Sequence, residues 1–524
     1  MARSTPIPVI DLFAGPGGLC EGFSSIRDGS GSACFTTRIS IEKDRVAHRT
    51  LLLRAAFRKF EGASAPDAYY DYVRGAIPRE DLIRSPRMRE ALEDASQEAR
   101  CAELGVDPHS EIDGWIRNAL RNRGDWVLIG GPPCQAYSLA GRSRMRGRDP
   151  AKFEADKRHF LYTEYLRIIQ GFAPAVFVME NVKGLLTSKH GGNPIFDRIV
   201  HDLRHPASGL TYHVRSLSTP GGNLRPEDFL VQAEDYGVPQ TRHRVFLVGI
   251  RSDVAARIAN LDDAALLLQR EKKQVSVEQA LDGLPQLRSM LSREPDSHET
   301  WLHAIREAPR SLKGWRVPLR NEIEREMAKA VERARSITSP GAPFIAGTRQ
   351  FTPAMPRELK AWYVDSRLEG VAHHEARRHI RSDLHRYMFA ACYGRLVNQT
   401  PKLRSFPPHL LPDHGNIGEG DQPFEDRFRV QIGGTPSTTI VSHIKKDGHY
   451  YIHPDPGQCR SFTVREAARL QTFPDNYFFE GSRTDQYGQV GNAVPPLLAR
   501  KIAEVVLRVM TAAGRRRAPN GAEA

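Results

Sequence analysis

The sequence predicts an α/β protein in which helices cover both faces of a doubly wound, Rossmann-like sheet, with an irregular α+β domain inserted into the chain. Two observations support this class. The first 250 residues or so alternate short apolar runs with helix-like stretches, which is typical of parallel strands joined by helices. From about residue 250 to 453 this alternation is lost, and an ordered amphipathic pattern returns only after residue 461.

The apolar runs place the expected elements along the chain. We expect strands at residues 8–13, 35–42, 126–130, 175–180 and 244–249, and helices at residues 160–172, 462–473 and 497–511. The same pattern predicts four parts of the chain: a main domain at 1–253 with a helical insertion at about 46–120, an inserted domain at 254–454, a segment at 455–512 that completes the main domain, and a disordered tail at 513–524.

Length and charge limit the classes of protein that fit. A chain of 524 residues exceeds one compact core, and 75 Lys and Arg against 62 Asp and Glu leave a net charge of +13, which hints at a polyanionic partner. No apolar run reaches the roughly 18 residues that cross a bilayer, and no secretion signal is visible. Six cysteines without a CxxC pair are too sparse for a disulfide framework. We therefore expect a cytoplasmic, reduced protein.

A glycine turn links the first expected strand to a helix in VIDLFAGPGGLCEGF, residues 9–23. Such a turn lets backbone N–H groups approach a ligand closely, although many are only structural. Cys20 occupies the third glycine position of GxGxxG, so the dinucleotide fingerprint is absent. Asp11 precedes the turn, and Glu42 ends the next strand, where a carboxylate can accept hydrogen bonds from ribose hydroxyls. The pattern favours a nucleoside cofactor without a diphosphate.

A lone cysteine follows the third expected strand in DWVLIGGPPCQAYS, residues 125–138. Most lone cysteines are inert core side chains. Cys134, however, comes directly after Gly-Gly-Pro-Pro, a stiff loop at the carboxyl end of a strand, and a thiol presented there is suited to act as a nucleophile. Four arginines follow within seven residues that contain no acid: Arg142, Arg144, Arg146 and Arg148.

Two further strands carry charged residues at their ends. Glu180 ends the apolar run of VFVMENV, where a poorly solvated carboxyl group is suited to donate a proton; the alternative is a purely structural acid. Arg242 and Arg244 precede the strand in YGVPQTRHRVFLVGI. Their spacing points both side chains the same way, so that they can clamp a carboxylate or an anionic ligand; the alternative is a pair of surface salt bridges.

Six segments occur in the order that resembles the DNA (cytosine-5)-methyltransferase family: DLFAGPGG, GGPPCQAYS, ENVKGL, QTRHRVFLVG, RSFTVREAARLQTFPD and QVGNAVPP. The resemblance covers about residues 7–250 and 455–505. It implies a methyltransferase sheet, S-adenosylmethionine as the cofactor, no metal, and duplex DNA as the substrate. It also suggests a prokaryotic restriction-modification enzyme that acts as a monomer on nucleoid DNA, with a cognate restriction endonuclease as its genetic partner.

The resemblance implies roles for the residues at the reacting centre. Cys134 matches the nucleophile whose thiolate adds to C6 of cytosine, and Glu180 matches the acid that protonates N3. Arg244, assisted by Arg242, matches the arginine that holds the base. C5 then attacks the sulfonium methyl group, and loss of the C5 proton expels the cysteine. The base must leave the duplex for this reaction.

The resemblance also implies a set of cofactor contacts, all at or near the expected strand ends. Asp113 is the expected adenine-side acid because of its separation from Cys134, although its surroundings, EIDGW, depart from the family pattern. The other expected cofactor residues are Asp11, Phe13, Gly15, Gly17, Gly18, Glu42, Pro133 and Asn492.

In this family the segment before the FTVREAARLQTF helix is the target-recognition domain, which predicts that role for residues 254–454. Residues 373–404 carry seven basic and two acidic side chains together with four histidines, and this composition predicts a surface that faces DNA phosphates; the alternative is a solvated helical face. A hairpin is expected around residues 446–449. The recognised DNA sequence cannot be inferred, because an irregular segment shows no register for base contacts.

Other classes of protein stay open at this point. An RNA cytosine-5 methyltransferase shares these motifs, but the CFT tripeptide of that branch occurs here only at residues 34–36, inside an expected strand. A catalytically silent DNA-binding protein would keep the scaffold, but Cys134, Glu180 and Arg244 are all intact. A nicotinamide dehydrogenase is the weakest alternative, because Cys20 replaces the third glycine.

Overall fold

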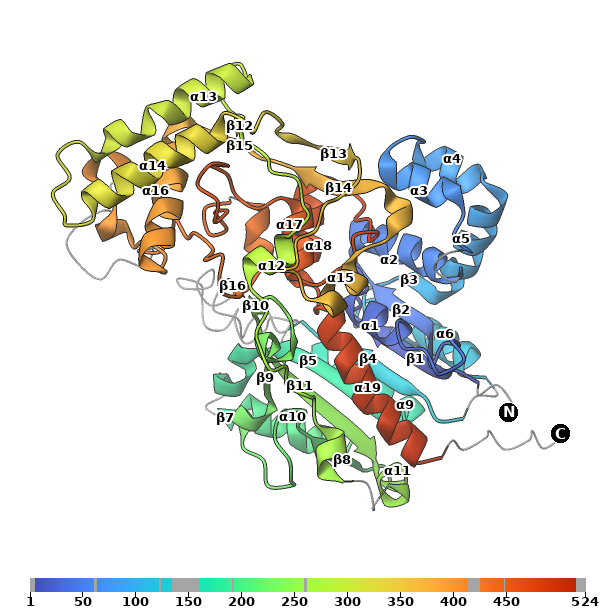
Figure 1. The fold of residues 1–524 in the computed structure, drawn as a ribbon. Helices are drawn as coiled ribbons and strands as arrows, with labels where there is room; N and C mark the ends of the chain where they lie inside the picture. The colour runs from blue at the N-terminus through green and yellow to red at the C-terminus, as the bar shows by residue number, and fades with distance from the viewer. Residues whose placement is uncertain are drawn as a thin grey trace.

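The computed structural model describes residues 5–60, 64–121, 124–133, 161–190, 193–258, 262–412, 425–446 and 448–514. Within these residues the central sheet has eight strands: β1 (Ile7–Leu12), β2 (Phe35–Glu42), β3 (Ala99–Cys101), β4 (Val127–Gly130), β5 (Val176–Val182), β8 (Tyr212–Arg215), β9 (Leu230–Gln232) and β11 (His243–Arg251). Their order is β3-β2-β1-β4-β5-β11-β8, with β9 paired to β11. Helices cover both faces of this sheet (Figure 1), which confirms the expected fold class.

The sheet changes direction at β11. β3, β2, β1, β4 and β5 are parallel to one another. β11 instead runs antiparallel to β5 and to β8, so the expectation of a parallel sheet fails at this strand. Because of the reversal, the amino end of β11 lies at the same edge of the sheet as the carboxyl ends of the parallel strands. The register pairs Phe246 with Glu180 and Arg244 with Val182.

Two helix layers enclose the sheet: α1 (Gly18–Ser24), α11 (Ser252–Arg257) and α19 (Pro496–Ala512) on one face, and α6 (His109–Leu120), α9 (Leu161–Phe172) and α10 (Ile195–Arg204) on the other. Alternate residues of β1 serve the two layers: Ile7 and Val9 pack with the first, and Ile10 and Leu12 with the second. Burial on both faces explains why the strands read as continuous apolar runs.

The expected helical insertion at residues 46–120 is an insertion only in part. It folds into α2 (Arg45–Arg58), α3 (Asp67–Arg74), α4 (Arg79–Arg84), α5 (Pro86–Glu98), β3 and α6. β3 pairs with β2, and α6 packs on the sheet, so both belong to the sheet itself. The helices α3, α4 and α5 form a separate apolar cluster that includes Leu368 and Ala372 from the inserted segment. The extra helices therefore bridge distant parts of the chain.

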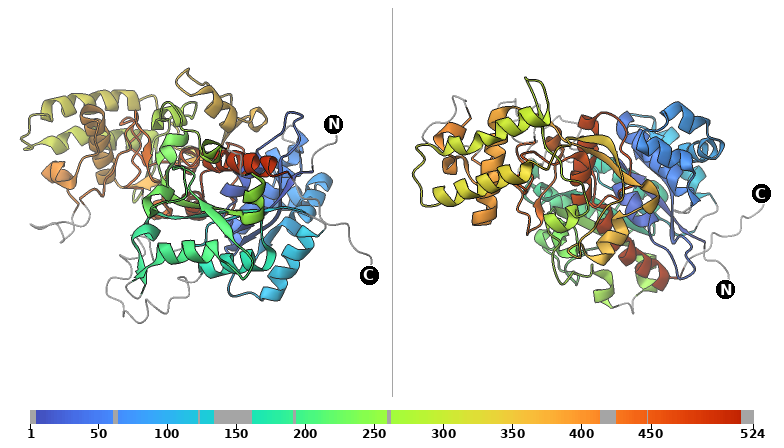
Figure 2. Two further views of the ribbon diagram at one scale, coloured as in Figure 1. Left: turned by 90° about the horizontal axis from the view of Figure 1, so that it is seen from below. Right: turned by 45° about the horizontal axis from the view of Figure 1, so that its top comes forward.

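The inserted segment builds its own core away from the sheet. Helices α13 (His298–Arg306), α14 (Arg320–Ala334) and α16 (Arg381–Val397) supply most of this core. Figure 1 and both views of Figure 2 show these helices at one end of the molecule and α3 to α5 at the other, with the C-terminal segment between them. The shorter elements are β10 (Gln240–Thr241), α12 (Val277–Leu281), β12 (Met290–Leu291), β13 (Gly341–Ala346), α15 (Arg357–Tyr363), β14 (Gly370–Glu375), β15 (Arg378–His379) and β16 (Ser437–Thr438).

Only part of residues 373–404, the stretch predicted to face DNA, lies on the surface. Three of its four histidines are buried, and so is the whole of α16 from residue 386 to 392. Arg386 donates to the Leu410 carbonyl at 2.8 Å, and Arg381 pairs with Glu294 at 2.7 Å. A count of charges does not distinguish the faces of a helix, and α16 turns its apolar residues and several of its polar ones inward. The exposed basic residues of the stretch are Arg378, Arg395, Lys402 and Arg404.

The prediction of a hairpin around residues 446–449 is wrong. Residues Ser442–Lys445 form a short 3-10 helix, η12, where the first strand was expected. Asp447, in the expected turn, lies outside the described residues. The backbone amides of Arg429 and Gln431 donate to the carbonyls of His449 and Ile452, so the second half of the segment pairs with residues 429–431.

The C-terminal segment is packed into the main domain. It carries α17 (Val464–Leu470), α18 (Arg483–Asn492) and α19. α19 crosses α1 so closely that a Cβ on Gly18 would lie 2.2 Å from the Val494 carbonyl oxygen, and one on Gly22 would lie 2.4 Å from the Arg500 nitrogen. Glycine is therefore required on this face of α1. The crossing also brings the QVGNAVPP motif to the glycine turn.

Candidate active site

Glu180 and Arg244 meet at the edge where the parallel strands end. Glu180 leaves β5 and Arg244 enters β11, and the antiparallel pairing of these strands brings the two side chains together. Arg244 Nε lies 3.0 Å from Glu180 Oε1, and the side chains are 15% and 14% exposed. An ion pair of this kind is shielded from water but keeps hydrogen-bonding groups that a ligand can reach. The expected acid and arginine thus form one unit.

The loop that follows β4 starts against this pair. A Cβ on Gly131 would lie 3.0 Å from Glu180 Oε2, so the start of this loop passes directly beside the Glu180 carboxylate. Asn181, the next residue of β5, donates from Nδ2 to the Pro132 carbonyl at 3.3 Å. These contacts hold the GGPP segment to the end of β5 beside the carboxylate.

Several expected residues lie outside the described part of the chain. The gap after Pro133 contains Cys134, the expected nucleophile, and the basic stretch at residues 142–148. The expected tail falls outside from residue 515 onward. The roles of these residues therefore stay predictions from the sequence.

The glycine turn at the end of β1 is held to the end of β2. Glu42 accepts hydrogen bonds from the Gly15 amide at 2.8 Å and from the Asp44 amide at 2.7 Å, one on each carboxylate oxygen. Gly15 and Gly17 have φ angles of +58° and +99°, which residues with a side chain rarely adopt. A Cβ on Gly15 would meet no described atom within 4 Å. One side of the turn therefore faces open space next to the Glu42 carboxylate.

Phe13 and Asp11 flank the end of β1 in different ways. Phe13 has a φ of +59°, a conformation that a bulky residue adopts only when its surroundings impose it, and such residues gather at functional sites. Asp11 is fully buried and accepts a hydrogen bond from Cys20 Sγ at 3.0 Å. Its other oxygen has no hydrogen-bond partner among the described residues, and burial raises the pKa of Asp11 to about 7. Asp11 therefore lies beneath the turn rather than on its open side.

Two other expected cofactor residues occupy unlike positions. Asn492 ends α18 as an exposed residue, two positions before Val494, whose backbone packs on Gly18. Asp113 lies on α6, where its carboxylate pairs with Arg167 of α9 at 2.7 Å. That ion pair belongs to the helix layer, and the carboxyl end of β3 is formed instead by Cys101.

Arg242 and Arg244 have different partners, so the two arginines do not form the expected joint clamp. The buried guanidinium of Arg242 donates to the carbonyls of Ala493 at 2.8 Å and Ile440 at 3.0 Å. Burial, together with the charge of Arg244, lowers the pKa of Arg242 to about 9, so the group is still charged at neutral pH. In this structure Arg242 joins the sheet edge to the inserted segment and to the C-terminal segment.

Sequence reasoning missed a buried network beneath the glycine turn. Glu21 of α1 pairs with Arg54 of α2, with Oε2 2.9 Å from Nε, and Tyr477 donates to the Pro16 carbonyl. Tyr477 follows Pro16 by 461 positions, and no spacing rule connects residues so far apart. The one available signal was Glu21 in a helix start made of apolar and small residues, which called for a buried cationic partner.

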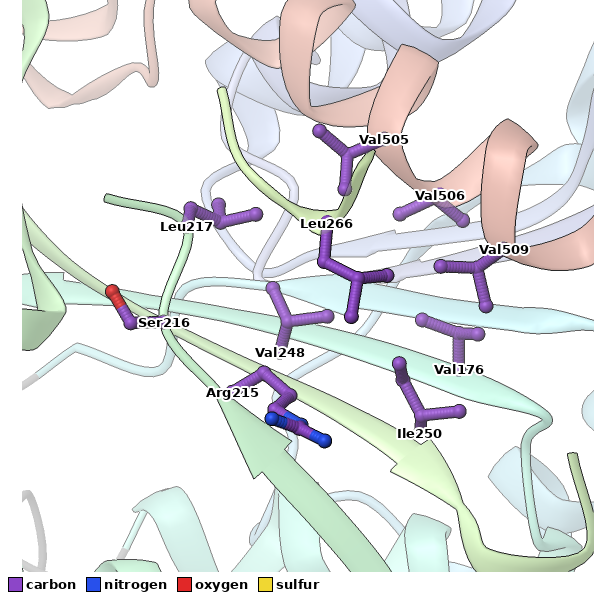
Figure 3. A pocket seen from close by; sticks show the side chains of 10 residues that line it. All are labelled: Val176, Arg215, Ser216, Leu217, Val248, Ile250, Leu266, Val505, Val506 and Val509. Carbon is purple, nitrogen blue, oxygen red and sulfur yellow. The ribbon is translucent and has the colours of Figure 1, made fainter. Parts of the chain in front are cut away.

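A small apolar cavity of about 10 Å³ lies at the opposite end of the sheet (Figure 3). It lies beneath α19 and includes Val176 at the start of β5 and Ile250 near the end of β11. Arg215 is the one charged residue among those that line it. Its volume and lining indicate a packing gap rather than a site for chemistry.

The family of the protein follows from a match that spans these features. Residues 117–508 match the family model described as C-5 cytosine-specific DNA methylase, a span that includes the Glu180–Arg244 pair and the whole C-terminal segment up to α19. The chain belongs to this family. Over 519 residues the methylase is 32% identical to the type II methyltransferase M.Bpa9945I of Bacillus paralicheniformis, with 96% of this chain and 99% of that protein covered.

Further comparisons agree with this result. The methylase is 26% identical over 418 residues to the DNA (cytosine-5-)-methyltransferase M.ApeKI of Aeropyrum pernix, covering 74% of this chain and 82% of that protein. A crystal structure of a putative DNA modification methyltransferase encoded within an E. coli prophage shares the fold, with a TM-score of 0.50 at 19% identity over 96% of this chain and 99% of that chain. The protein is thus an enzyme of the DNA (cytosine-5-)-methyltransferase class.

The described residues of the methylase contain neither a membrane-spanning helix nor a cluster of metal-binding side chains. None of its helices is both long and apolar enough to span a membrane. No group of three or more His, Cys, Asp or Glu in that part of the chain is arranged to hold a metal ion.

Proposed function

We propose that this methylase transfers a methyl group from S-adenosylmethionine to C5 of a cytosine within a specific sequence of duplex DNA. Cys134 acts as the nucleophile, and the target base is turned out of the helix. The observation that carries the proposal is the Glu180–Arg244 ion pair, which contacts the first residues of the loop that leads to Cys134. An acid, an arginine and the start of a thiol-bearing loop are what this reaction requires in one place.

The chemistry explains why these residue types belong together. C5 of cytosine is part of an aromatic ring and is a weak nucleophile until the Cys134 thiolate adds to C6. A hydrogen bond from Glu180 to N3 draws electrons from the ring and favours that addition. Arg244 holds the Glu180 carboxyl group in place and holds the base. After methylation, loss of the C5 proton restores the C5–C6 double bond as the Cys134 sulfur leaves.

The residues of the glycine turn fit S-adenosylmethionine. When bound, this cofactor supplies a methyl group on a positively charged sulfur. The space beside Gly15 leaves room for a ligand, and Glu42 keeps acceptor capacity for ribose hydroxyls beyond its bonds to two backbone amides. Phe13 directly precedes this turn, and Asn492 lies two positions before Val494, which packs on Gly18. A nucleoside cofactor without a diphosphate needs no phosphate-binding lysine, and the turn contains none.

We assign sequence recognition to residues 254–454. A polar pocket of about 160 Å³ in this segment is lined by residues with side chains that can hydrogen-bond to base edges, among them Arg395 and Asn398 at the end of α16 and Glu278 beside the Gly433 turn. From the family resemblance of the sequence we further propose that a restriction endonuclease is the genetic partner and that the monomer is the active form. Bisulfite sequencing of DNA from a host that expresses the chain would identify the methylated sequence.

Trapping on duplex DNA that contains 5-fluorocytosine tests the mechanism. Fluorine at C5 cannot leave as a proton does, so the covalent adduct should accumulate in the presence of S-adenosylmethionine. The wild-type protein should give a denaturation-resistant protein–DNA band, and Cys134→Ala should give none. Methyl transfer without an adduct would exclude the covalent mechanism. A wild-type protein that fails to methylate any mixed-sequence duplex DNA would exclude the proposed function. Methylation of transfer RNA but not of DNA would show that the substrate is RNA.

A further inference from the structure

Tyr477, from the C-terminal segment, closes the buried side of the glycine turn. Its hydroxyl donates to the carbonyl of Pro16. A Cβ on Gly17 would lie 3.1 Å from that hydroxyl oxygen and 2.9 Å from Cδ1 of Leu51, so both side chains pack directly under the turn. At Gly15, by contrast, the turn is open. Tyr477 thus supports the turn from the protein interior and leaves the open side to a ligand.

Neighbouring groups hold the Tyr477 ring in this position. Arg54 lies 4.8 Å from the centre of the ring and forms a two-pronged ion pair with Glu21 of α1, at 2.9 Å and 2.5 Å. Arg54 also donates to the side-chain oxygen of Asn476, the residue before the tyrosine, at 3.0 Å. Because Arg54 and Glu21 are both buried, salt screens their attraction little. The Arg54–Glu21 pair therefore connects the Tyr477 ring to the start of α1, next to the glycine turn.

From these contacts we propose that Tyr477 is a positioning residue for the cofactor site. Its hydroxyl holds the Pro16 carbonyl so that the turn stays in the conformation that receives S-adenosylmethionine. The inference rests on the proposed function, because it takes the glycine turn as the cofactor site. Gly15 and Gly17 leave the free turn many conformations, and without this hydrogen bond the turn would have to be ordered when the cofactor binds. The conformational entropy lost on ordering the turn would then weaken the binding of the cofactor.

Tyr487 offers a matched control in the same part of the molecule. It is also fully buried, lies in the same apolar cluster as Tyr477, and donates its hydroxyl to a backbone carbonyl, that of Phe462, at 2.6 Å. Replacing either tyrosine with phenylalanine removes one buried hydroxyl and leaves the ring. The two variants therefore suffer the same kind of damage to the fold, and they differ in whether the lost hydrogen bond reaches the glycine turn.

The experiment compares the full-length wild-type protein, Tyr477→Phe and Tyr487→Phe. Isothermal titration calorimetry measures the Kd for S-adenosylmethionine and for its unreactive analogue sinefungin, and thermal unfolding records the Tm of each variant. We expect Tyr477→Phe to raise both Kd values about 5- to 10-fold, the effect of one lost buried hydrogen bond. In steady-state kinetics its KM for S-adenosylmethionine should rise in parallel, with kcat and the KM for DNA unchanged. Tyr487→Phe should lower the Tm to a similar extent and leave cofactor affinity unchanged.

Two results would overturn the inference: cofactor binding by Tyr477→Phe that equals the wild type, or an equal loss of affinity in Tyr487→Phe, which would show a general effect of destabilisation. A fall in kcat with unchanged cofactor Kd would also overturn it, because the residue would then act on the chemical step. Failure of the wild-type protein to bind S-adenosylmethionine would instead refute the proposed cofactor, and with it the proposed function.

Discussion

Ion pairs in two regions of the molecule use their charged side chains in different ways. At the sheet edge, Glu180 and Arg244 form an ion pair whose members are 14% and 15% exposed. In the C-terminal segment, Arg469 and Asp475 pair at 2.9 Å, with both side chains 0% exposed. The first pair keeps groups that a ligand can reach, whereas the second is closed to ligand and water alike. Both pairs join an arginine to a carboxylate, so these two pairs differ in the accessibility of their remaining hydrogen-bonding capacity and not in residue type.

Other groups use the remaining hydrogen-bonding capacity of the buried Arg469–Asp475 pair. Arg469 Nη1 donates to the carbonyls of Ala280 at 3.2 Å and Asp282 at 2.7 Å, and its other two nitrogens each donate to one oxygen of Asp475. Arg349 donates to Asp475 as well. Ala280, Asp282 and Arg349 all belong to the inserted segment, so this cluster fastens that segment to the C-terminal one. Its loss should cost stability rather than chemistry.

The largest expected effect is on the buried pair. Asp475→Asn leaves the buried charges of Arg469 and Arg349 without their carboxylate, and the free energy of unfolding should fall by about 3–5 kcal/mol. Urea unfolding followed by circular dichroism measures this change. The turnover of the molecules that stay folded at low temperature should differ little from the wild type. An Asp475→Asn variant with normal stability but no activity would contradict the structural role assigned to the buried pair.

The second-largest effect is expected at the Glu180–Arg244 pair, where a substitution should lower activity rather than stability. Glu180→Gln keeps the shape but removes the proton donor, and the methyl-transfer rate should fall about 10²- to 10³-fold, or about 3–4 kcal/mol, while the Tm stays nearly constant. Glu164→Gln is the matched control, since Glu164 pairs with Arg167 at 3.1 Å and is 13% exposed, close to the value for Glu180. An equal loss of activity in the control would contradict the assignment.

A pH titration sharpens the comparison through His374, which is fully buried near the Arg460–Glu466 pair. Its Nε2 donates to the Pro285 carbonyl at 2.8 Å, and its Nδ1 accepts from the Thr463 hydroxyl at 2.9 Å, so the neutral ring is satisfied and a second proton would break a hydrogen bond. Burial lowers the pKa of His374 from 6.5 to about 4. The unfolded chain therefore binds more protons than the folded one between these values.

It follows that the folded state loses stability as the pH falls from 6.5 towards 4, by about 3 kcal/mol from this group alone. Urea unfolding at pH 7, 5.5 and 4.5 measures the slope. His374→Gln should reduce the slope but not abolish it, because burial also lowers the pKa of His379 and of His453. An unchanged slope in that variant would contradict the neutral, buried state of His374.

The smallest expected effect concerns the cofactor side of the sheet edge. Glu42→Gln keeps one acceptor oxygen for the backbone amides but loses the charge, and the Kd for S-adenosylmethionine should rise about 10-fold, or about 1.4 kcal/mol. Calorimetry on the full-length protein measures the change, with kcat at saturating cofactor expected to stay within about twofold. Unchanged affinity would argue against a ribose contact at Glu42 and would leave the Glu180 prediction intact.

The sheet edge was accessible to sequence reasoning because the end of a strand is a local event. An apolar run that stops at Glu180, and a glycine turn followed one strand later by Glu42, can each be read within a few residues. The direction of β11 could not be read in this way, since a buried strand has the same apolar pattern in either direction. That direction nevertheless decides that Arg244 lies 3.0 Å from Glu180.

The inserted segment resisted prediction for a different reason. Its basic composition at residues 373–404 resembled a nucleic-acid surface, yet Arg386 and three histidines of that stretch are buried. A count of charges does not say which side of an element faces the core, and here the aromatic and aliphatic residues of α16 draw the whole helix inward. The choice of Asp113 as a cofactor acid relied on a separation along the chain, and the structure shows its carboxylate paired with Arg167.

The sequence by itself determined the family, five of the eight described strands of the sheet and the residues at the ends of those five, because six ordered motifs and local apolar patterns carry that information. The tertiary structure alone decided which of those residues meet: Arg244 joins Glu180, whereas Arg242, two positions away, turns to the carbonyls of Ile440 and Ala493. It also decided that Tyr477 supports a turn at the other end of the chain. Such contacts depend on how buried groups find partners across the whole fold, and no local pattern encodes that choice.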